Sequence, residues 1–244
     1  MDELYKMIFK RKSVRKYSDD LKISDTELED INKKIKELVP LVDSIKVKCV
    51  IAPREETTSK RGEYCLLIYS EEKDNYLLNV GYMFEQLDLY LASKNIGVCW
   101  YGLGKVKADY KEKLKYVIML TLGKVTDDDF RKDYTEAKRN DTHDAWTGEH
   151  IDDIAEMAKY APSACNSQPW KVICEKDTLK VYRSNKSKSL IPKRFLSYYN
   201  YIDIGIYLYF LELVMSHNKI EFKRMLVANA EDSDMLPVAT YELK

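Results

Sequence analysis

The chain has 244 residues, in which 40 lysines and arginines balance 40 aspartates and glutamates and 45% of residues are hydrophobic. This length suits one large domain or two small ones, and the apolar fraction is enough for a folded core, which excludes wholesale disorder. The zero net charge argues against nucleic acid or an acidic membrane as the main partner.

Targeting and metal signals are missing from the sequence. The first residues contain no apolar core of the kind a signal peptide needs, and Asp203 and Glu212 interrupt the longest apolar run, which is too short to span a bilayer. The five cysteines form no CxxC pair, and the three histidines form no HExxH motif. We interpret the cysteines as free thiols of a cytoplasmic protein and expect no bound metal.

The first half predicts a mixture of helices and strands. It begins with a basic segment, RKSVR at 11–15, and a capping box, SDTE at 24–27, predicts the start of an amphipathic helix. The later elements are a strand hairpin at 47–51 and 64–69, a long apolar helix at 79–96, a glycine-containing segment at 97–105 and a strand at 116–122. The polar stretch 126–148 is interpreted as a linker.

The second half predicts the same order. An amphipathic helix starts near Glu149 and stops before Pro162, and the segment APSACNSQPW follows at 161–170. The remaining predicted elements are strands at 170–174 and 179–182, a long helix at 203–220, and strands at 221–227 and 238–243.

The two long helices align with each other. Residues 79–96 match residues 203–220 without a gap, and Gly81 meets Gly205. Together with the shared order of elements, this alignment predicts an α+β fold made of two related halves that mimic a two-fold dimer. We place the halves at 1–125 and 149–244, with the linker at 126–148.

Three segments carry residues suited to ligand binding. In RKSVR, arginine forks and a hydroxyl suit phosphate oxygens, and Val14 is the apparent anchor. In APSACNSQPW, small residues permit close approach, and the amides of Asn166 and Gln168 suit a ring edge with alternating donors and acceptors. The glycines of 97–105 let a backbone N–H approach a ligand. The alternatives are a solvated basic stretch, a proline-punctuated loop and a simple turn.

These segments resemble a known family. RKSVRKY, APSACNSQPW and NIGVCWYGLG are similar to the three hallmarks of FMN-dependent nitroreductases, in which FMN lies at a homodimer interface. Because APSACNSQPW stands in the second half, the chain resembles the fused branch called "putative TM nitroreductase", in which one chain carries two nitroreductase-like halves.

The resemblance implies a set of cofactor-binding residues. Arg11, Lys12 and Ser13 would hold the FMN phosphate, and Arg15 would face the pyrimidine edge of the flavin. The other implied residues are the basic pair Lys138 and Arg139, the turn Tyr101, Gly102 and Leu103, whose backbone would approach the flavin N5, and Pro162, Ser163, Ala164, Asn166 and Gln168 from the second half. Further contacts to the O2 side of the flavin are not located.

The resemblance also implies an activity. NADH or NADPH would give a hydride to FMN, and an electron-poor acceptor such as a nitroaromatic or a quinone would take it in a ping-pong cycle, with no catalytic side chain required. One set of motifs predicts one FMN per chain, in a monomer or a weak homodimer. Two alternatives remain open. One is a flavin-binding protein without turnover, in which Tyr198, Tyr199 and Tyr201 block the nicotinamide face, and the other is a regulatory domain without flavin.

Overall fold

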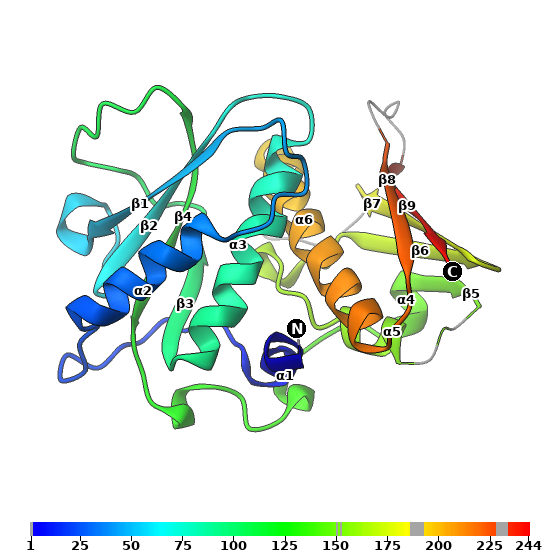
Figure 1. Cartoon of the computed structure of the whole chain (residues 1–244), viewed down its shortest axis with the longest axis horizontal. Coiled ribbons are helices and arrows are strands. Elements are labelled where there is room, and N and C mark those ends of the chain that lie inside the picture. The colour runs from blue at the N-terminus through cyan, green and yellow to red at the C-terminus, as the bar shows by residue number, and fades with distance from the viewer. Residues whose placement is uncertain (1, 150, 152, 186–192, 228–233) are drawn as a thin grey trace.

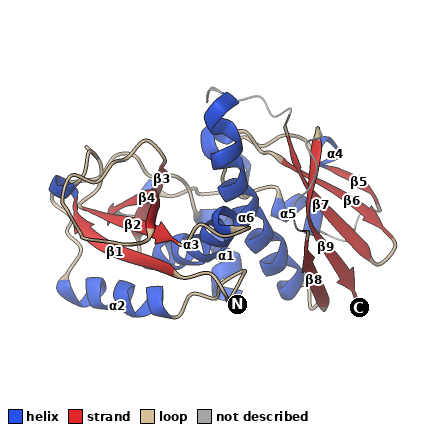
Figure 2. Ribbon diagram, turned by 90° about the horizontal axis from the view of Figure 1, so that it is seen from above, coloured by secondary structure: helices blue, strands red, loops and turns tan. Residues whose placement is uncertain are grey.

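The chain folds into two β-sheets on either side of a pair of long helices (Figures 1 and 2). The computed structural model describes residues 2–149, 151, 153–185, 193–227 and 234–244. Helices α3 (Tyr76–Ser93) and α6 (Lys193–His217) lie between the sheets, and most of α3 is buried. This arrangement explains why both helices are apolar on most of their surface.

The first sheet is antiparallel, with the strand order β1-β2-β4-β3. Its strands are β1 (Val47–Pro53), β2 (Tyr64–Ser70), β3 (Ile96–Tyr101) and β4 (Lys115–Lys124). Helices α1 (Asp2–Lys10) and α2 (Asp25–Lys36) precede it. The predicted capping box starts α2, because the Ser24 hydroxyl accepts the Glu27 N–H and the Glu27 carboxylate accepts the Ser24 N–H.

The second sheet has the order β5-β6-β7-β9-β8. Its strands are β5 (Trp146–Gly148), β6 (Trp170–Glu175), β7 (Thr178–Ser184), β8 (Phe222–Leu226) and β9 (Met235–Leu243), of which β5 alone pairs in parallel. Two short helices, α4 (Thr142–Ala145) and α5 (Ile154–Ala158), accompany it. Without β5, the order β6-β7-β9-β8 repeats that of the first sheet.

The two long helices cross in close contact at Gly81 and Gly205. A methyl group on Gly81 would overlap the carbonyl oxygen of Ile202, and one on Gly205 would overlap the carbonyl oxygen of Leu78. Glycine at both positions therefore lets the two backbones touch. Among the described helices, none combines the length and the apolar character that crossing a bilayer requires.

The mixed α+β class and both hairpins are confirmed, and three details of the prediction are wrong. The segment 97–105, for which a simple turn was one alternative, begins inside β3, which runs to Tyr101. The helix expected from Glu149 is only Ile154–Ala158. The stretch 126–148 ends in β5, which hydrogen-bonds into the second sheet. The tyrosines at 198–201 lie inside α6 and not before it.

Candidate functional site

The RKSVR segment lies against the edge strand β3. The Val14 N–H donates to the Val98 carbonyl over 2.9 Å, and Ser13 forms an isolated parallel bridge with Val98. Val14 is 4% exposed and packs on Gly97, where a side chain would leave no room. Val14 is thus the anchor that the sequence indicated, and it fixes the positions of the flanking polar residues.

Arg11, which the resemblance places at a flavin phosphate, pairs with a buried carboxylate in the structure. Its guanidinium is 2% exposed and donates to Asp88 of α3, from Nε over 3.0 Å and from Nη2 over 2.7 Å. Glu85 lies 3.7 Å from Arg11 Nε, and Trp100 Nε1 also donates to Asp88 over 3.1 Å. Arg11 therefore serves first to neutralise a buried carboxylate.

The loop between α5 and β6 holds a strained backbone. Cys165, Asn166 and Gln168 have φ of 50°, 55° and 47°, in the left-handed region that costs energy for residues other than glycine. Two hydrogen bonds stabilise this loop, from Ala164 N–H to Asp203 Oδ1 and from Gln168 N–H to Ser163 Oγ, each over 2.9 Å. Strained conformations of this kind are known from active sites and ligand-binding loops.

Asp203 is the buried support of that loop. It lies on α6, where burial raises the pKa of its carboxyl to about 8, although the Ala164 N–H and the Ser167 hydroxyl favour the ionised form. In the first half, Asn79 occupies the aligned position and its Oδ1 accepts the N–H groups of Leu41 and Val42. On each of the two long helices, a short polar side chain thus accepts hydrogen bonds from the backbone of a loop.

The predicted basic pair and the predicted amides meet in the structure. Arg139 donates to Asn166 Oδ1 from Nη1 and to the Tyr160 carbonyl from Nη2, each over 3.0 Å. Asn166 Nδ2 in turn donates to the Lys138 carbonyl over 2.9 Å, and Gln168 Oε1 accepts the Asn140 N–H over 2.9 Å. The basic pair Lys138 and Arg139 therefore lies directly on the strained loop.

We call Arg11, Arg131 and Arg139 the arginine cluster. Their combined positive charge exceeds the negative charge of the carboxylates around them. Burial and repulsion within the cluster lower the pKa of Arg139 to about 9 and that of Arg131 to about 10. The Nε of Arg139 and the Nη1 of Arg131 are buried with no hydrogen-bond partner among the described residues. Buried donors of this kind are rare in a folded protein, and an anion would satisfy them.

The nearby carboxylates do not compensate all of this positive charge. Asp88 is engaged by Arg11 and Trp100, and burial together with the charge of Asp88 raises the pKa of Glu85 well above its usual range. Neither oxygen of Glu85 has a hydrogen-bond partner among the described residues. The cluster therefore keeps a net positive charge.

Aromatic contacts connect the N-terminal segment with the loop of the second half. The ring of Phe9 lies 5.5 Å from that of Tyr134, which lies 5.1 Å from that of Tyr160, two residues before Pro162. The Arg131 N–H donates to the Lys10 carbonyl over 3.0 Å. Residues next to RKSVR and residues next to APSACNSQPW thus approach each other through the segment 131–139.

The predicted turn after β3 contacts the second half. Tyr199 of α6 donates its hydroxyl to the Gly102 carbonyl over 2.8 Å, and its ring fills the space that a side chain on Gly102 would need. Leu103 is 79% exposed, and the ring of Tyr101 lies 5.7 Å from the guanidinium of Arg61. The turn is therefore accessible at Leu103 and covered by Tyr199 at Gly102.

Sequence reasoning missed several polar residues of this region, namely Glu85, Asp88, Trp100, Arg131 and Asp203. For Asp88 and Asp203 a signal existed, because a carboxylate in a buried apolar helix requires a partner. Arg131 lies in a polar stretch without periodicity, so its sequence context carries no comparable signal.

The structure combines a mixed α+β fold with buried arginine donors that have no hydrogen-bond partner among the described residues and that lie beside the strained loop. The chain belongs to the family described as putative TM nitroreductase, whose family model matches residues 3–215. It is also similar in structure to a putative nitroreductase from Thermotoga maritima, with 19% sequence identity, a TM-score of 0.64, and coverage of 99% of this chain and 93% of that one. No curated protein matches the sequence.

Proposed function

We propose that this protein is an FMN-dependent oxidoreductase that takes a hydride from NADH or NADPH and delivers it to an electron-poor acceptor such as a nitroaromatic or a quinone. The observation that carries the proposal is the arginine cluster, whose unpartnered buried donors lie beside the strained loop. A flavin phosphate is a dianion of the size that such donors accept. Family membership supports the redox class.

The phosphate would be held chiefly by Arg131 and Arg139, with Arg11 adding charge from its pair with Asp88. Ser13, Lys12 and Lys138 would contribute further donors, and Arg15 would meet the pyrimidine edge. The proposed ring contacts are Tyr101, Gly102 and Leu103 from the first half and Pro162, Ser163, Ala164, Asn166 and Gln168 from the second. These residues fit the group because they offer cations, small side chains and amides in adjoining segments.

The bound flavin would supply the two-electron chemistry, in a ping-pong cycle. The tasks left to the protein are to bind the phosphate, to orient the ring with the Asn166 and Gln168 amides, and to present a backbone N–H of the 101–103 turn. The cycle requires no nucleophile and no general acid from the chain, and we assign no catalytic side chain.

We further propose that the chain consists of two related halves, 1–125 and 149–244. The shared strand order, the reciprocal contacts of Gly81 and Gly205, and the matching roles of Asn79 and Asp203 support this division. The two halves would then enclose one cofactor between them, as two subunits do in a nitroreductase dimer, and the chain would act as a monomer.

A comparison of the two helices supports one FMN per chain. Glu212 of α6 aligns with Asp88 of α3, and its carboxylate accepts hydrogen bonds from Tyr82 and Tyr241, each over 2.7 Å, and from Arg224. This network contains no unpartnered cation among the described residues. The region around Glu212, which corresponds to the region around Asp88, is therefore filled by the protein's own side chains.

One contact favours a second candidate, a protein that binds FMN without turnover. Tyr199 packs on Gly102, next to the proposed approach to the flavin N5. A tyrosine that stays there after flavin binds would block the nicotinamide from that face.

A flavin titration and a turnover assay test the proposal. The protein is incubated with FMN and desalted, the bound flavin is measured from its visible absorption, and NADH and NADPH oxidation is followed with menadione or nitrofurazone. We expect bound flavin and multiple turnovers. Bound flavin without turnover would favour the second candidate, and a protein that stays colourless would overturn both.

A further inference from the structure

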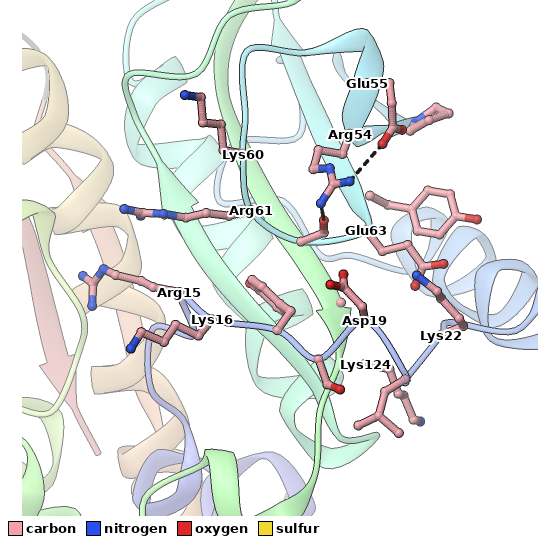
Figure 3. Close-up of a pocket in the computed structure, with 17 residues that line it drawn as sticks. Arg15, Lys16, Asp19, Lys22, Arg54, Glu55, Lys60, Arg61, Glu63 and Lys124 are labelled. Carbon is pink, nitrogen blue, oxygen red and sulfur yellow. Dashed lines mark hydrogen bonds and ion pairs between the residues drawn. The ribbon is translucent and has the colours of Figure 1, made fainter.

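A hollow of about 700 Å³ lies on the first half, outside the arginine cluster (Figure 3). Its walls are the segment 15–22 that follows RKSVR, the connection between β1 and β2 at 53–64, and residues 123–124 at the end of β4. Tyr17 fixes the first wall, because its ring packs on Gly123 and its hydroxyl donates to the Val14 carbonyl over 2.9 Å. This volume is in the range of small-molecule sites.

The charges around this hollow are unbalanced. Its lining includes the cations Arg15, Lys16, Lys22, Arg54, Lys60, Arg61 and Lys124, against the acids Asp19, Glu55 and Glu63. Two of the acids are already engaged, since Glu55 pairs with Arg54 over 3.1 Å and Glu63 accepts the Ile23 N–H over 2.9 Å. Lys124 is paired with Glu27.

The uncompensated cations collect at one end. Arg15, Lys16, Lys60 and Arg61 extend in the same direction, whereas Arg54, Glu55, Glu63 and Lys22 lie toward the other end (Figure 3). None of these four cations pairs with a carboxylate in the described part of the chain. We call this group the cationic end.

The cationic end adjoins the proposed flavin site. Arg61 lies over the ring of Tyr101. Arg15 and Arg61 also act on Cys99 of β3, because burial raises the pKa of its thiol and the charges of the two arginines partly offset that rise. Tyr101 and Arg15 belong to the proposed flavin contacts. A molecule bound in the hollow would therefore lie next to the flavin, with its negative groups held away from the ring.

We propose that the hollow binds the phosphate-bearing adenosine end of the nicotinamide nucleotide. This inference rests on the proposed function, because it names the site for part of the electron donor. Lys16, Lys60 and Arg61, which have no carboxylate partner in the described part of the chain and no role at the proposed flavin site, suit phosphate oxygens. Tyr17 and Tyr64 add aromatic surface for a base. A long nucleic acid fits less well, because acids line the other end of the hollow and the whole chain has no net charge.

Kinetics with truncated donors test the site. In the double variant Lys16→Gln/Lys60→Gln, kcat/KM for NADH and NADPH should fall about tenfold or more, since charge-assisted contacts are lost. Reduced nicotinamide mononucleotide, which lacks the adenosine end, should react at an unchanged rate. The matched control is Lys180→Gln/Lys223→Gln, which removes two lysines from the second sheet and should leave all three donors unaffected.

A binding measurement without turnover separates this proposal from the proposed function. Calorimetric titration of the flavin-loaded protein with ADP and with 2′,5′-ADP should give binding that the first double variant weakens and the control does not. Tighter binding of 2′,5′-ADP would assign the cationic end to a 2′-phosphate, and equal binding would assign it to the diphosphate.

Two results would overturn the site: no binding of either nucleotide, or equal loss of NADH and mononucleotide activity in the double variant. Competition by a short single-stranded oligonucleotide that binds more tightly than ADP would also overturn it. If ADP binds through Lys16 and Lys60 but no donor is oxidised, the hollow is retained and the proposed oxidoreductase activity fails.

Discussion

At the residue scale, arginines of one cluster have opposite roles. Arg11 neutralises a buried carboxylate, whereas Arg131 and Arg139 lie beside other cations and keep buried donors that have no partner among the described residues. A residue of the first kind stabilises the fold. A residue of the second kind is retained at a cost in stability, which fits a role in binding an anion.

Arg139→Gln should separate binding from stability. We expect FMN to bind more weakly by about 1.5–3 kcal/mol, as for hydrogen bonds to a charged group. The free energy of unfolding of the flavin-free protein should change by less than about 1 kcal/mol, because the repulsion by Arg131 and Arg11 is also removed. Fluorescence titration of FMN and urea unfolding measure the two quantities.

Arg11→Gln is the matched comparison. It leaves Asp88 buried with only the Trp100 N–H as a charge-stabilising partner, so the free energy of unfolding should fall by about 3–5 kcal/mol. If Arg139→Gln kept the full FMN affinity, the arginine cluster would not be the phosphate site.

Asp203 should make stability depend on pH. The pKa in the folded protein is about 8, whereas an unperturbed aspartate has a pKa of about 3.9. The folded state therefore holds a proton that the unfolded state has lost, and the stabilisation present below the unfolded pKa is lost as the pH rises toward 8. Asp203→Asn keeps the acceptor for the Ala164 N–H and removes the titration.

Urea unfolding at pH 5.5, 7 and 8.5 tests this prediction. The stability of the wild type relative to Asp203→Asn should decrease with rising pH, by at most about 1.4 kcal/mol per unit. Asp203→Ala removes the acceptor as well and should weaken FMN binding, because the strained loop loses its support. Parallel pH profiles for wild type and Asp203→Asn would show that Asp203 is ionised throughout.

The decisive feature at the element scale is the crossing of α3 and α6. Alanine favours a helix over glycine by about 1 kcal/mol. At this crossing, however, an added methyl meets a carbonyl oxygen of the other helix. Gly81→Ala and Gly205→Ala should therefore each destabilise the protein by about 1–3 kcal/mol, as overpacking does.

The double variant Gly81→Ala/Gly205→Ala should cost less than the sum of the single variants, because one displacement of the helices accommodates both methyl groups. Exposed Glu29→Ala in α2 serves as the control, and its effect should stay within about 0.5 kcal/mol. Denaturant unfolding measures all four variants. Stabilisation by either glycine substitution would contradict the close crossing.

At the scale of the whole molecule, the aligned acids Asp88 and Glu212 of the two long helices have different surroundings. Asp88 pairs with Arg11 of the arginine cluster, in which Arg131 and Arg139 keep donors without partners among the described residues, whereas Glu212 has three donors from the chain itself. Under the two-half arrangement that we propose, this difference predicts one cofactor for the whole chain.

Native mass spectrometry should give one FMN per chain at saturation and a monomeric chain. Glu212→Gln weakens the second network, so it should lower stability while the stoichiometry stays at one. Two FMN per chain, in the wild type or in this variant, would refute the asymmetry. Two FMN per two chains with no monomer would instead show that the complete site needs a second copy.

Local chemistry in the sequence predicted much of the fold and part of the candidate site. The capping box at Ser24, the two hairpins, the two apolar helices and the proline that ends a helix near Tyr160 all depend on neighbouring residues, so they were readable without coordinates. The basic segment and the small-residue loop were recognisable for the same reason.

Only the tertiary structure decided which of these residues meet. Arg11 and Asp88 are 77 positions apart, and no local pattern pairs them. The strand β3 was not predicted, because its glycine serves the packing of Val14, a contact with a distant segment. Propensity and periodicity act over a few residues, whereas buried charge is satisfied by whatever the fold brings near. The partners of the buried charges, and with them the arginine cluster, therefore came from the structure alone.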